Sequence, residues 1–221
     1  MLLALDTSTR TVGLALYDGA QVVAETIWTG TDFHTVELAP AVSDTLKRSG
    51  TDISKIQVLA VATGPGSFTG LRIGMALAKG LALSRNLPLI GVPTLDFLAA
   101  GQPVGDYPLA AVLRAGRGRL AVGWYKASKG TWQPTGMELL TAAELAQRIE
   151  SATVICGELT EDERRLLGRK RKIALLASPA ASLRRPGFLA ECAWRRWQTG
   201  KVDDPATLAP IYLHHGDPIP E

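Results

Sequence analysis

The chain has 221 residues, of which 46% are hydrophobic and 20% are charged, and its formal net charge is +3. This composition argues against a disordered protein, and no apolar run approaches the about 20 residues that a membrane span needs. Because Cys156 and Cys192 share no metal-like or redox spacing and the amino-terminal segment lacks the features of a secretory signal, we expect a cytoplasmic protein with reduced thiols.

The first 100 residues are predicted to form an α/β lobe that begins with three antiparallel strands. Asp18-Gly19 between two apolar runs is a strong signal for a hairpin turn. An amphipathic helix with basic residues in its last turn follows, and Gly50 closes it. In chain order we expect strands at 2–6, 11–17 and 21–28, a helix at 35–49, a strand at 58–62, a helix from 67, a strand at 88–92 and a helix at 94–100.

The glycine-rich segment at residues 64–74 joins a buried strand to a helix and excludes several enzyme classes. It lacks the Gly-Lys-Ser/Thr ending of a P-loop, its glycines miss the dinucleotide-binding spacing by one residue, and Ser67 lacks the flanking glycines of a hydrolase nucleophile. Three glycines within one helix should cost about 3 kcal/mol relative to alanine, so close backbone contact is expected to compensate. The small-residue stripe is Gly70, Gly74, Ala78 and Ala82, beside an apolar row at Ile73, Leu77 and Leu81. We expect one row to pack on the sheet and the other on a second helix.

Two polar turns at strand ends together form a candidate phosphate-binding site. A carboxylate at a strand end can hold a cation, while nearby hydroxyl and backbone N–H groups can meet a phosphate. The structural alternatives are a carboxylate that accepts hydrogen bonds from its own turn, and a glycine turn that only links strand to helix. The candidate residues are Asp6, Thr7 and Ser8 in the first turn and Gly64, Gly66 and Ser67 in the second.

The three histidines do not predict a metal site. A helical metal pair that began at His34 would need a second ligand four residues on, where Leu38 stands. His214 and His215 are adjacent in a proline-rich tail, where a solvated pair is expected. Since no nucleophile–base pair is evident either, no catalytic residue is predicted.

Residues 101–221 are predicted to form a second, smaller lobe after a linker at 101–108. This half has a net charge of +4, against −1 for residues 1–100. The run Arg169–Lys172 and other basic clusters could attract RNA, although cations near helix ends are a more ordinary explanation. The expected elements repeat the order of the first half: strands at 109–115, 120–126 and 132–140, a helix at 142–150, a strand at 153–156, a helix at 161–167, a strand at 173–177 and a helix at 187–198.

Five motifs, spread from the first strand to near the carboxyl end, resemble the TsaB (YeaZ) family. The most specific is the glycine motif Gly-Pro-Gly-Ser-Phe-Thr-Gly-Leu-Arg-Ile-Gly at 64–74. The others are Leu-Ala-Leu-Asp-Thr-Ser at 3–8, His-Thr-Val-Glu-Leu-Ala-Pro at 34–40, Pro-Leu-Ile-Gly-Val-Pro-Thr-Leu at 88–95 and Pro-Ile-Tyr-Leu at 210–213. The resemblance implies an α/β protein of the ASKHA class, the actin-like ATPase and ribonuclease H-like fold, with two related lobes at 1–100 and 101–221.

The resemblance also implies a non-catalytic accessory protein for threonylcarbamoyladenosine synthesis in tRNA. In this family TsaB is the non-catalytic relative of TsaD, whose helical His-x-x-x-His metal pair is reduced here to His34 and Leu38. The implied partners are TsaD, bound through the first-lobe helices, the ATPase TsaE, a second copy when the chain is alone, and tRNA through the complex. The resemblance implies no membrane and no cofactor of its own, with ATP or ADP held within the complex. The expected partner interface is His34, Glu37, Leu38, Gly70, Leu71, Gly74 and Ala78.

One segment departs from the family pattern. The second lobe of the family usually carries Asp-Ala-Arg-x-Gly-Glu-Val-Tyr, whereas both acids are arginines here, Arg114 and Arg119. Any family role that needs acidic residues there is therefore in doubt. Three rival functions stay open: a metal-dependent nucleotide or acyl-group transferase that uses Asp6 and Ser67, a tRNA-binding module that uses the second-lobe arginines, and a protease, which has the least support.

Overall fold

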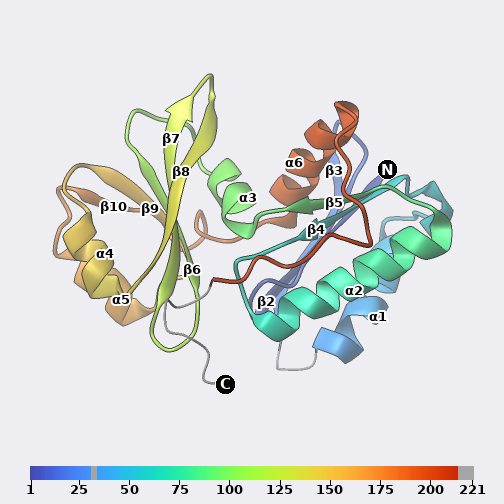
Figure 1. The fold of residues 1–221 in the computed structure, drawn as a ribbon, viewed down its shortest axis with the longest axis horizontal. Coiled ribbons are helices and arrows are strands. Elements are labelled where there is room, and N and C mark those ends of the chain that lie inside the picture. The colour runs from blue at the N-terminus through green and yellow to red at the C-terminus, as the bar shows by residue number, and fades with distance from the viewer. Residues whose placement is uncertain (31–33, 214–221) are drawn as a thin grey trace.

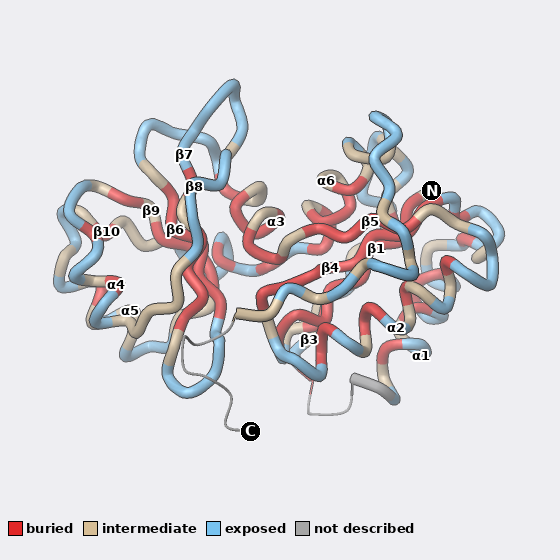
Figure 2. Tube along the Cα trace, viewed as in Figure 1, coloured by how far each residue is buried: buried red, intermediate tan, exposed pale blue. Residues whose placement is uncertain are grey.

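The computed structural model describes residues 1–30 and 34–213, without the side chains of residues 34 and 35. Two five-stranded sheets lie side by side, and helices cover them (Figure 1). Figure 2 shows that the buried residues follow the central strands of both sheets, so each lobe has its own core. Within the described residues, the helices are all too short or too polar to cross a membrane.

The first sheet has the strand order β3-β2-β1-β4-β5, with the first three strands antiparallel and the last three parallel. Leu3 and Leu5 of β1 pack with helices α1 and α2 on one face, while Leu2 and Ala4 pack with α6 on the other. These strands are therefore apolar on both faces because both faces are covered. The bounds are β1 Leu2–Asp6, β2 Thr11–Tyr17, β3 Val22–Thr29, β4 Val58–Ala62, β5 Leu89–Val92, α1 His34–Arg48, α2 Phe68–Arg85 and α6 Pro186–Gln198.

The second sheet repeats this arrangement with the order β8-β7-β6-β9-β10. Its first three strands are again antiparallel and its last three parallel, so the two lobes share one topology. Helices α4 and α5 cover one face and α3 lies against the other. The bounds are β6 Leu109–Arg114, β7 Leu120–Ser128, β8 Thr131–Leu140, β9 Thr153–Gly157, β10 Ala174–Leu176, α3 Thr94–Ala100, α4 Ala142–Arg148 and α5 Glu161–Gly168.

The predicted elements are found, each with bounds that differ by at most two residues from those expected, and the α/β class is confirmed. Helices α4 and α5 each begin with a capping box, formed by Thr141 with Glu144 and by Thr160 with Glu163. The short helix η1, Ile53–Lys55, was not expected. Local signals therefore account for nearly all of the secondary structure, because caps, turns and periodicity act over a few residues.

Two helices cross the expected boundary between the lobes. Helix α6 lies within the range assigned to the second lobe, yet it packs on the first sheet. Helix α3 lies within the range assigned to the first lobe, but Leu95 and Leu98 pack on the second sheet while Phe97 faces the core of the first. The division at residue 100 thus describes the order of the sheets along the chain, while the helices tie the lobes together.

A partly buried hydrogen bond joins α3 to the second sheet. The Tyr125 hydroxyl of β7 donates to Oδ1 of Asp96 at 2.8 Å. Burial raises the pKa of Asp96 above its usual 3.8, although the bond from Tyr125 opposes this effect. The folded state therefore binds a proton more tightly than the unfolded state does, and the free energy of unfolding should fall as pH rises from 3.8 through the raised pKa.

We expect Asp96→Asn to remove this loss of stability while it keeps an oxygen for Tyr125. Thermal unfolding between about pH 4 and pH 7 should then show a flatter profile for the variant than for the parent chain. Asp106→Asn, at an exposed aspartate, is the control and should leave the profile unchanged. If the stability of Asp96→Asn changed with pH as steeply as that of the parent chain, the pH dependence could not be assigned to Asp96.

Candidate functional site

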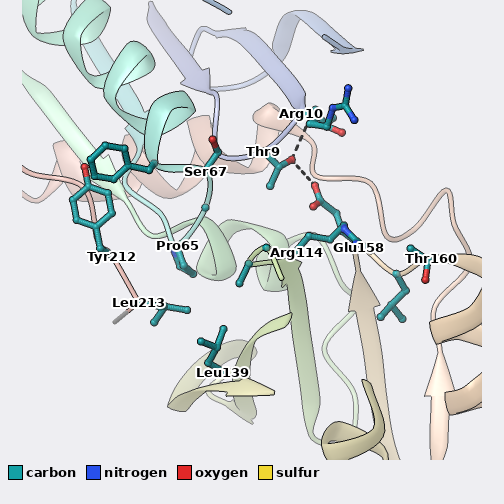
Figure 3. A pocket seen from close by; sticks show the side chains of 16 residues that line it. Thr9, Arg10, Pro65, Ser67, Arg114, Leu139, Glu158, Thr160, Tyr212 and Leu213 are labelled. Atoms are coloured by element: carbon teal, nitrogen blue, oxygen red, sulfur yellow. Dashed lines mark hydrogen bonds between the residues drawn. The ribbon is translucent and has the colours of Figure 1, made fainter. Parts of the chain in front are cut away.

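A cleft of about 990 Å³ lies between the two lobes (Figure 3). Ser67 and Pro65 of the glycine-rich turn lie on one side, and Glu158 and Thr160 of the second lobe lie on the other. Its volume is at the upper end of the range of small-molecule sites, about 300–1,000 Å³. The lining residues are Thr9, Arg10, Thr11, Pro65, Gly66, Ser67, Phe68, Arg114, Ala115, Gly116, Leu139, Glu158, Leu159, Thr160, Tyr212 and Leu213.

Next to the cleft, which Gly66 and Ser67 line, the glycine-rich segment packs directly against the turn that follows β1. A Cβ atom on Gly66 would clash with the Ser8 carbonyl oxygen, and one on Gly70 would clash with the Thr7 carbonyl oxygen. A Cβ atom on Gly74 would meet the Thr7 hydroxyl. The glycines are therefore required for close contact between α2 and the first strand, which is the compensation expected from the sequence.

The residues of the candidate phosphate site are brought together, but many of their donors are already paired within the chain. The backbone N–H of Ser67 donates to the Ser8 carbonyl at 2.6 Å, and the Ser8 N–H donates to Asp6 Oδ1 at 2.9 Å. The Gly64 N–H donates to the Thr94 hydroxyl at 3.0 Å, and the Thr7 hydroxyl donates to the Gly70 carbonyl at 2.7 Å. In this arrangement those groups are not free to hold an anion.

Ser67 has a structural partner rather than a catalytic one among the described residues. Its hydroxyl oxygen caps α2 by accepting a hydrogen bond from the Gly70 N–H at 3.2 Å. Such caps stabilise a helix by about 1 kcal/mol. Among the side chains that the structure describes, which do not include that of His34, no group of three or more His, Cys, Asp or Glu is placed to hold a metal ion.

Asp6 is neutralised by an arginine that sequence analysis did not select. Its Oδ2 pairs with Nε of Arg184 at 2.8 Å, and both side chains are only 1% exposed. The same guanidinium pairs with Glu158, which projects from the second lobe. Arg184 is followed directly by Arg185, and nothing in the sequence distinguishes the buried arginine from its exposed neighbour.

The expected partner interface needs a correction, because most of its residues point inward. Gly70, Leu71, Gly74 and Ala78 are buried against the chain itself, so the small-residue stripe packs on the sheet and cannot be a contact surface in the folded chain. The side chain of His34 lies outside the described residues. Glu37 is half-buried and accepts a hydrogen bond from the Trp28 indole at 3.4 Å, while Leu38 is 2% exposed.

An apolar groove between α1 and α2 is the accessible feature of this region. It has a volume of about 450 Å³ and is lined by Leu38 and Ala39 of α1 and by Phe68, Thr69, Arg72, Ile73, Ala76 and Leu77 of α2. A second hollow of about 370 Å³ follows the same pair of helices toward Leu81. The row at Ile73, Leu77 and Leu81 thus adjoins α1, as the sequence predicted.

The end of this groove nearest the cleft carries a stack of two aromatic rings and a guanidinium. The Arg72 Cζ atom lies 3.7 Å from the centroid of the Phe68 ring, and Arg72 Nε donates to the Tyr212 hydroxyl at 3.0 Å. Phe68 remains 53% exposed. The stack holds the guanidinium in place beside the groove, and arginines and aromatic residues are enriched at the centres of protein interfaces.

Of the two arginines that replace family acids, Arg114 lines the cleft and Arg119 is not among its lining residues. Arg114 lines the cleft and forms a partly exposed pair with Glu163 at 3.4 Å. Arg119 ends the β6–β7 turn, where its carbonyl accepts a hydrogen bond from the Ala115 N–H at 2.9 Å. Arg171 and Lys172, in the other basic cluster, are exposed between α5 and β10.

Comparison with known proteins gives a family match, relatives among curated proteins and similar solved structures. The model of the TsaD family, described as tRNA N6-adenosine threonylcarbamoyltransferase, matches residues 21–156. The tRNA threonylcarbamoyladenosine biosynthesis protein TsaB of Escherichia coli (strain K12) is 45% identical over 100 residues, which cover 45% of this chain and 43% of that protein. The protein of the same name from Bacillus subtilis (strain 168) is 38% identical over 129 residues, 58% of this chain and 56% of that protein. The chain therefore matches about half the length of these curated relatives.

Among solved structures, YeaZ from Pseudomonas aeruginosa is similar across both lobes. The similarity covers 96% of this chain and 99% of that chain, with a TM-score of 0.78 and 27% sequence identity. Together with the family match, this likeness confirms the fold class expected from the sequence, an ASKHA-type α/β fold.

Proposed function

The chain belongs to the TsaB/YeaZ family, and on that premise we propose that it takes part in the synthesis of threonylcarbamoyladenosine in tRNA. We propose that it acts as an accessory subunit, which binds TsaD and supports its activity, rather than as the enzyme that transfers the threonylcarbamoyl group. TsaE and tRNA would join through the assembled complex.

The observation that supports the accessory role is that the candidate phosphate-site residues beside the cleft are already paired within the chain. The carboxylate of Asp6 is paired with Arg184, and the neighbouring N–H groups of Ser8, Gly64 and Ser67 donate within the chain. A transferase that used Asp6 and Ser67 would need those groups free for its substrate. This supports a subunit without turnover of its own, and we place the ATP-dependent steps on the partner subunits.

We propose that TsaD docks on the α1–α2 groove instead of on the buried glycine stripe. The groove offers an apolar surface between two helices, and Arg72 beside it is held ready to pair with a carboxylate. A helix of the partner that carries apolar residues and one acidic side chain fits this surface. A second copy of the chain would use the same surface when TsaD is absent.

The direct test is reconstitution with purified TsaD, TsaE, tRNA and the small-molecule substrates. We expect modified adenosine to form only when this chain and TsaD are both present, and the two to elute as one complex. Modified tRNA made by this chain without TsaD would contradict the accessory role. Full activity of the mixture without this chain would contradict its participation.

A further inference from the structure

Arg184 lies where three segments of the chain meet between the lobes. Its Nε donates to Asp6 at the end of β1, and one terminal nitrogen pairs with Glu158, which follows β9 of the second sheet. The other terminal nitrogen donates to the Thr9 hydroxyl at 3.0 Å and to the Thr11 carbonyl at 2.9 Å. Arg184 itself stands two residues before α6, which packs on the first sheet.

The guanidinium is enclosed, and all three of its nitrogens are paired. The Arg184 side chain is 1% exposed, and each of its three nitrogens has an oxygen partner. Thr9 completes the cluster, since its hydroxyl also donates to Glu158 (Figure 3). A buried charge is tolerated only with such complete pairing, and removal of one partner of a buried ion pair is strongly destabilising.

The two carboxylates come from different lobes, so the cation between them fixes the lobes relative to each other. Asp6 belongs to the first sheet and Glu158 is anchored to the second by its N–H, which donates to the Val112 carbonyl at 3.0 Å. Without a cation, the buried carboxylate of Asp6 and the partly buried carboxylate of Glu158 would face each other, and their repulsion would favour separation of the lobes.

We propose that Asp6, Glu158 and Thr9 form an interlobe cation site that the chain fills with its own guanidinium, Arg184. The built-in cation holds the cleft at one angle without any external ligand. This inference does not depend on the proposed function, because it concerns the geometry of the isolated chain.

The test is replacement of the guanidinium by a soluble one. In Arg184→Ala, methylguanidinium at ten times its dissociation constant should raise the melting temperature by about 3–4 °C, because it binds the folded state alone. Arg185→Ala is the matched control: that neighbouring arginine pairs with Glu25 at the surface and its side chain is 55% exposed, so no rescue is expected there. Glu158→Gln added to Arg184→Ala should abolish the rescue.

Interlobe distances give a second readout that a loss of stability alone would not produce. Spin labels at Arg48→Cys and Gln147→Cys, both exposed and on different lobes, should report a broader distance distribution in Arg184→Ala, with Cys192 replaced by alanine to prevent stray labelling. Added methylguanidinium should narrow the distance distribution of Arg184→Ala again. If Arg184→Ala does not fold, Arg184→Lys keeps the charge but loses the planar fork and should show the same broadening to a smaller extent. The proposal would be overturned if the interlobe distance distribution were unchanged in the folded Arg184→Ala variant. It would also be overturned if methylguanidinium raised the melting temperature of Arg185→Ala equally, or if Mg²⁺ but not methylguanidinium raised that of Arg184→Ala.

Discussion

Gly70→Ala is expected to destabilise the chain by about 3 kcal/mol, because the added methyl group has no room. The new Cβ atom would lie well inside contact distance of the Thr7 carbonyl oxygen, a backbone atom that cannot move without disturbing β1 and its turn. Helix propensity alone would favour alanine by about 1 kcal/mol, so the steric effect must overcome this gain. Because the clash outweighs the gain in helix propensity, Gly70→Ala should lower the free energy of unfolding.

Gly80→Ala in the same helix is the matched control. A Cβ atom at Gly80 meets nothing within 4 Å, so only the propensity gain remains and the variant should be more stable by up to about 1 kcal/mol. Urea unfolding of both variants measures the difference. Equal effects of the two substitutions would show that the close contact between α2 and the first strand is not needed for stability.

Ala76→Glu is expected to weaken binding to TsaD at least about 100-fold, since it buries a charge in an apolar contact and, one helical turn from Arg72, competes with the partner's carboxylate for that guanidinium. Ala76 is exposed in the free chain and lines the α1–α2 groove, so the substitution should leave the fold intact. Glutamate is also a good helix former. The expected loss is thus one of docking rather than of folding.

Titration calorimetry with purified TsaD measures this effect, and the melting temperature of the variant checks its fold. Ala143→Glu introduces the same change at an exposed alanine of α4 in the second lobe and should bind TsaD as the parent chain does. Undiminished affinity of a folded Ala76→Glu variant would place the docking surface elsewhere.

The small-residue stripe shows why a sequence pattern alone cannot tell an accessible face of a helix from a buried one. Gly70, Gly74 and Ala78 recur every four residues and so share one face of α2, as the sequence established. Whether that face meets a partner or the chain's own sheet depends on which way the helix is rotated. Because Gly70 and Gly74 contact Thr7, the small-residue face of α2 lies toward the first sheet, and Arg72 and Ala76 lie on the accessible side of the helix.

The sequence determined the secondary structure, the ASKHA-type class and the TsaB/YeaZ membership, because caps, turns, periodicity and short motifs are local properties of the chain. The sequence also predicted that the turn after Asp6 and the glycine turn form one site, and these two turns do lie together. Each of these signals acts over a few residues.

Only the tertiary structure decided what those residues contact. In it, α6 packs on the first sheet and α3 contributes Leu95 and Leu98 to the core of the second. Arg184 also pairs with Asp6, 178 positions away in the chain. Arg184 and Arg185 are the same residue type side by side, yet one is buried and the other exposed. Burial and charge pairing depend on segments far apart in sequence, and no local pattern records which distant carboxylate will face a given arginine.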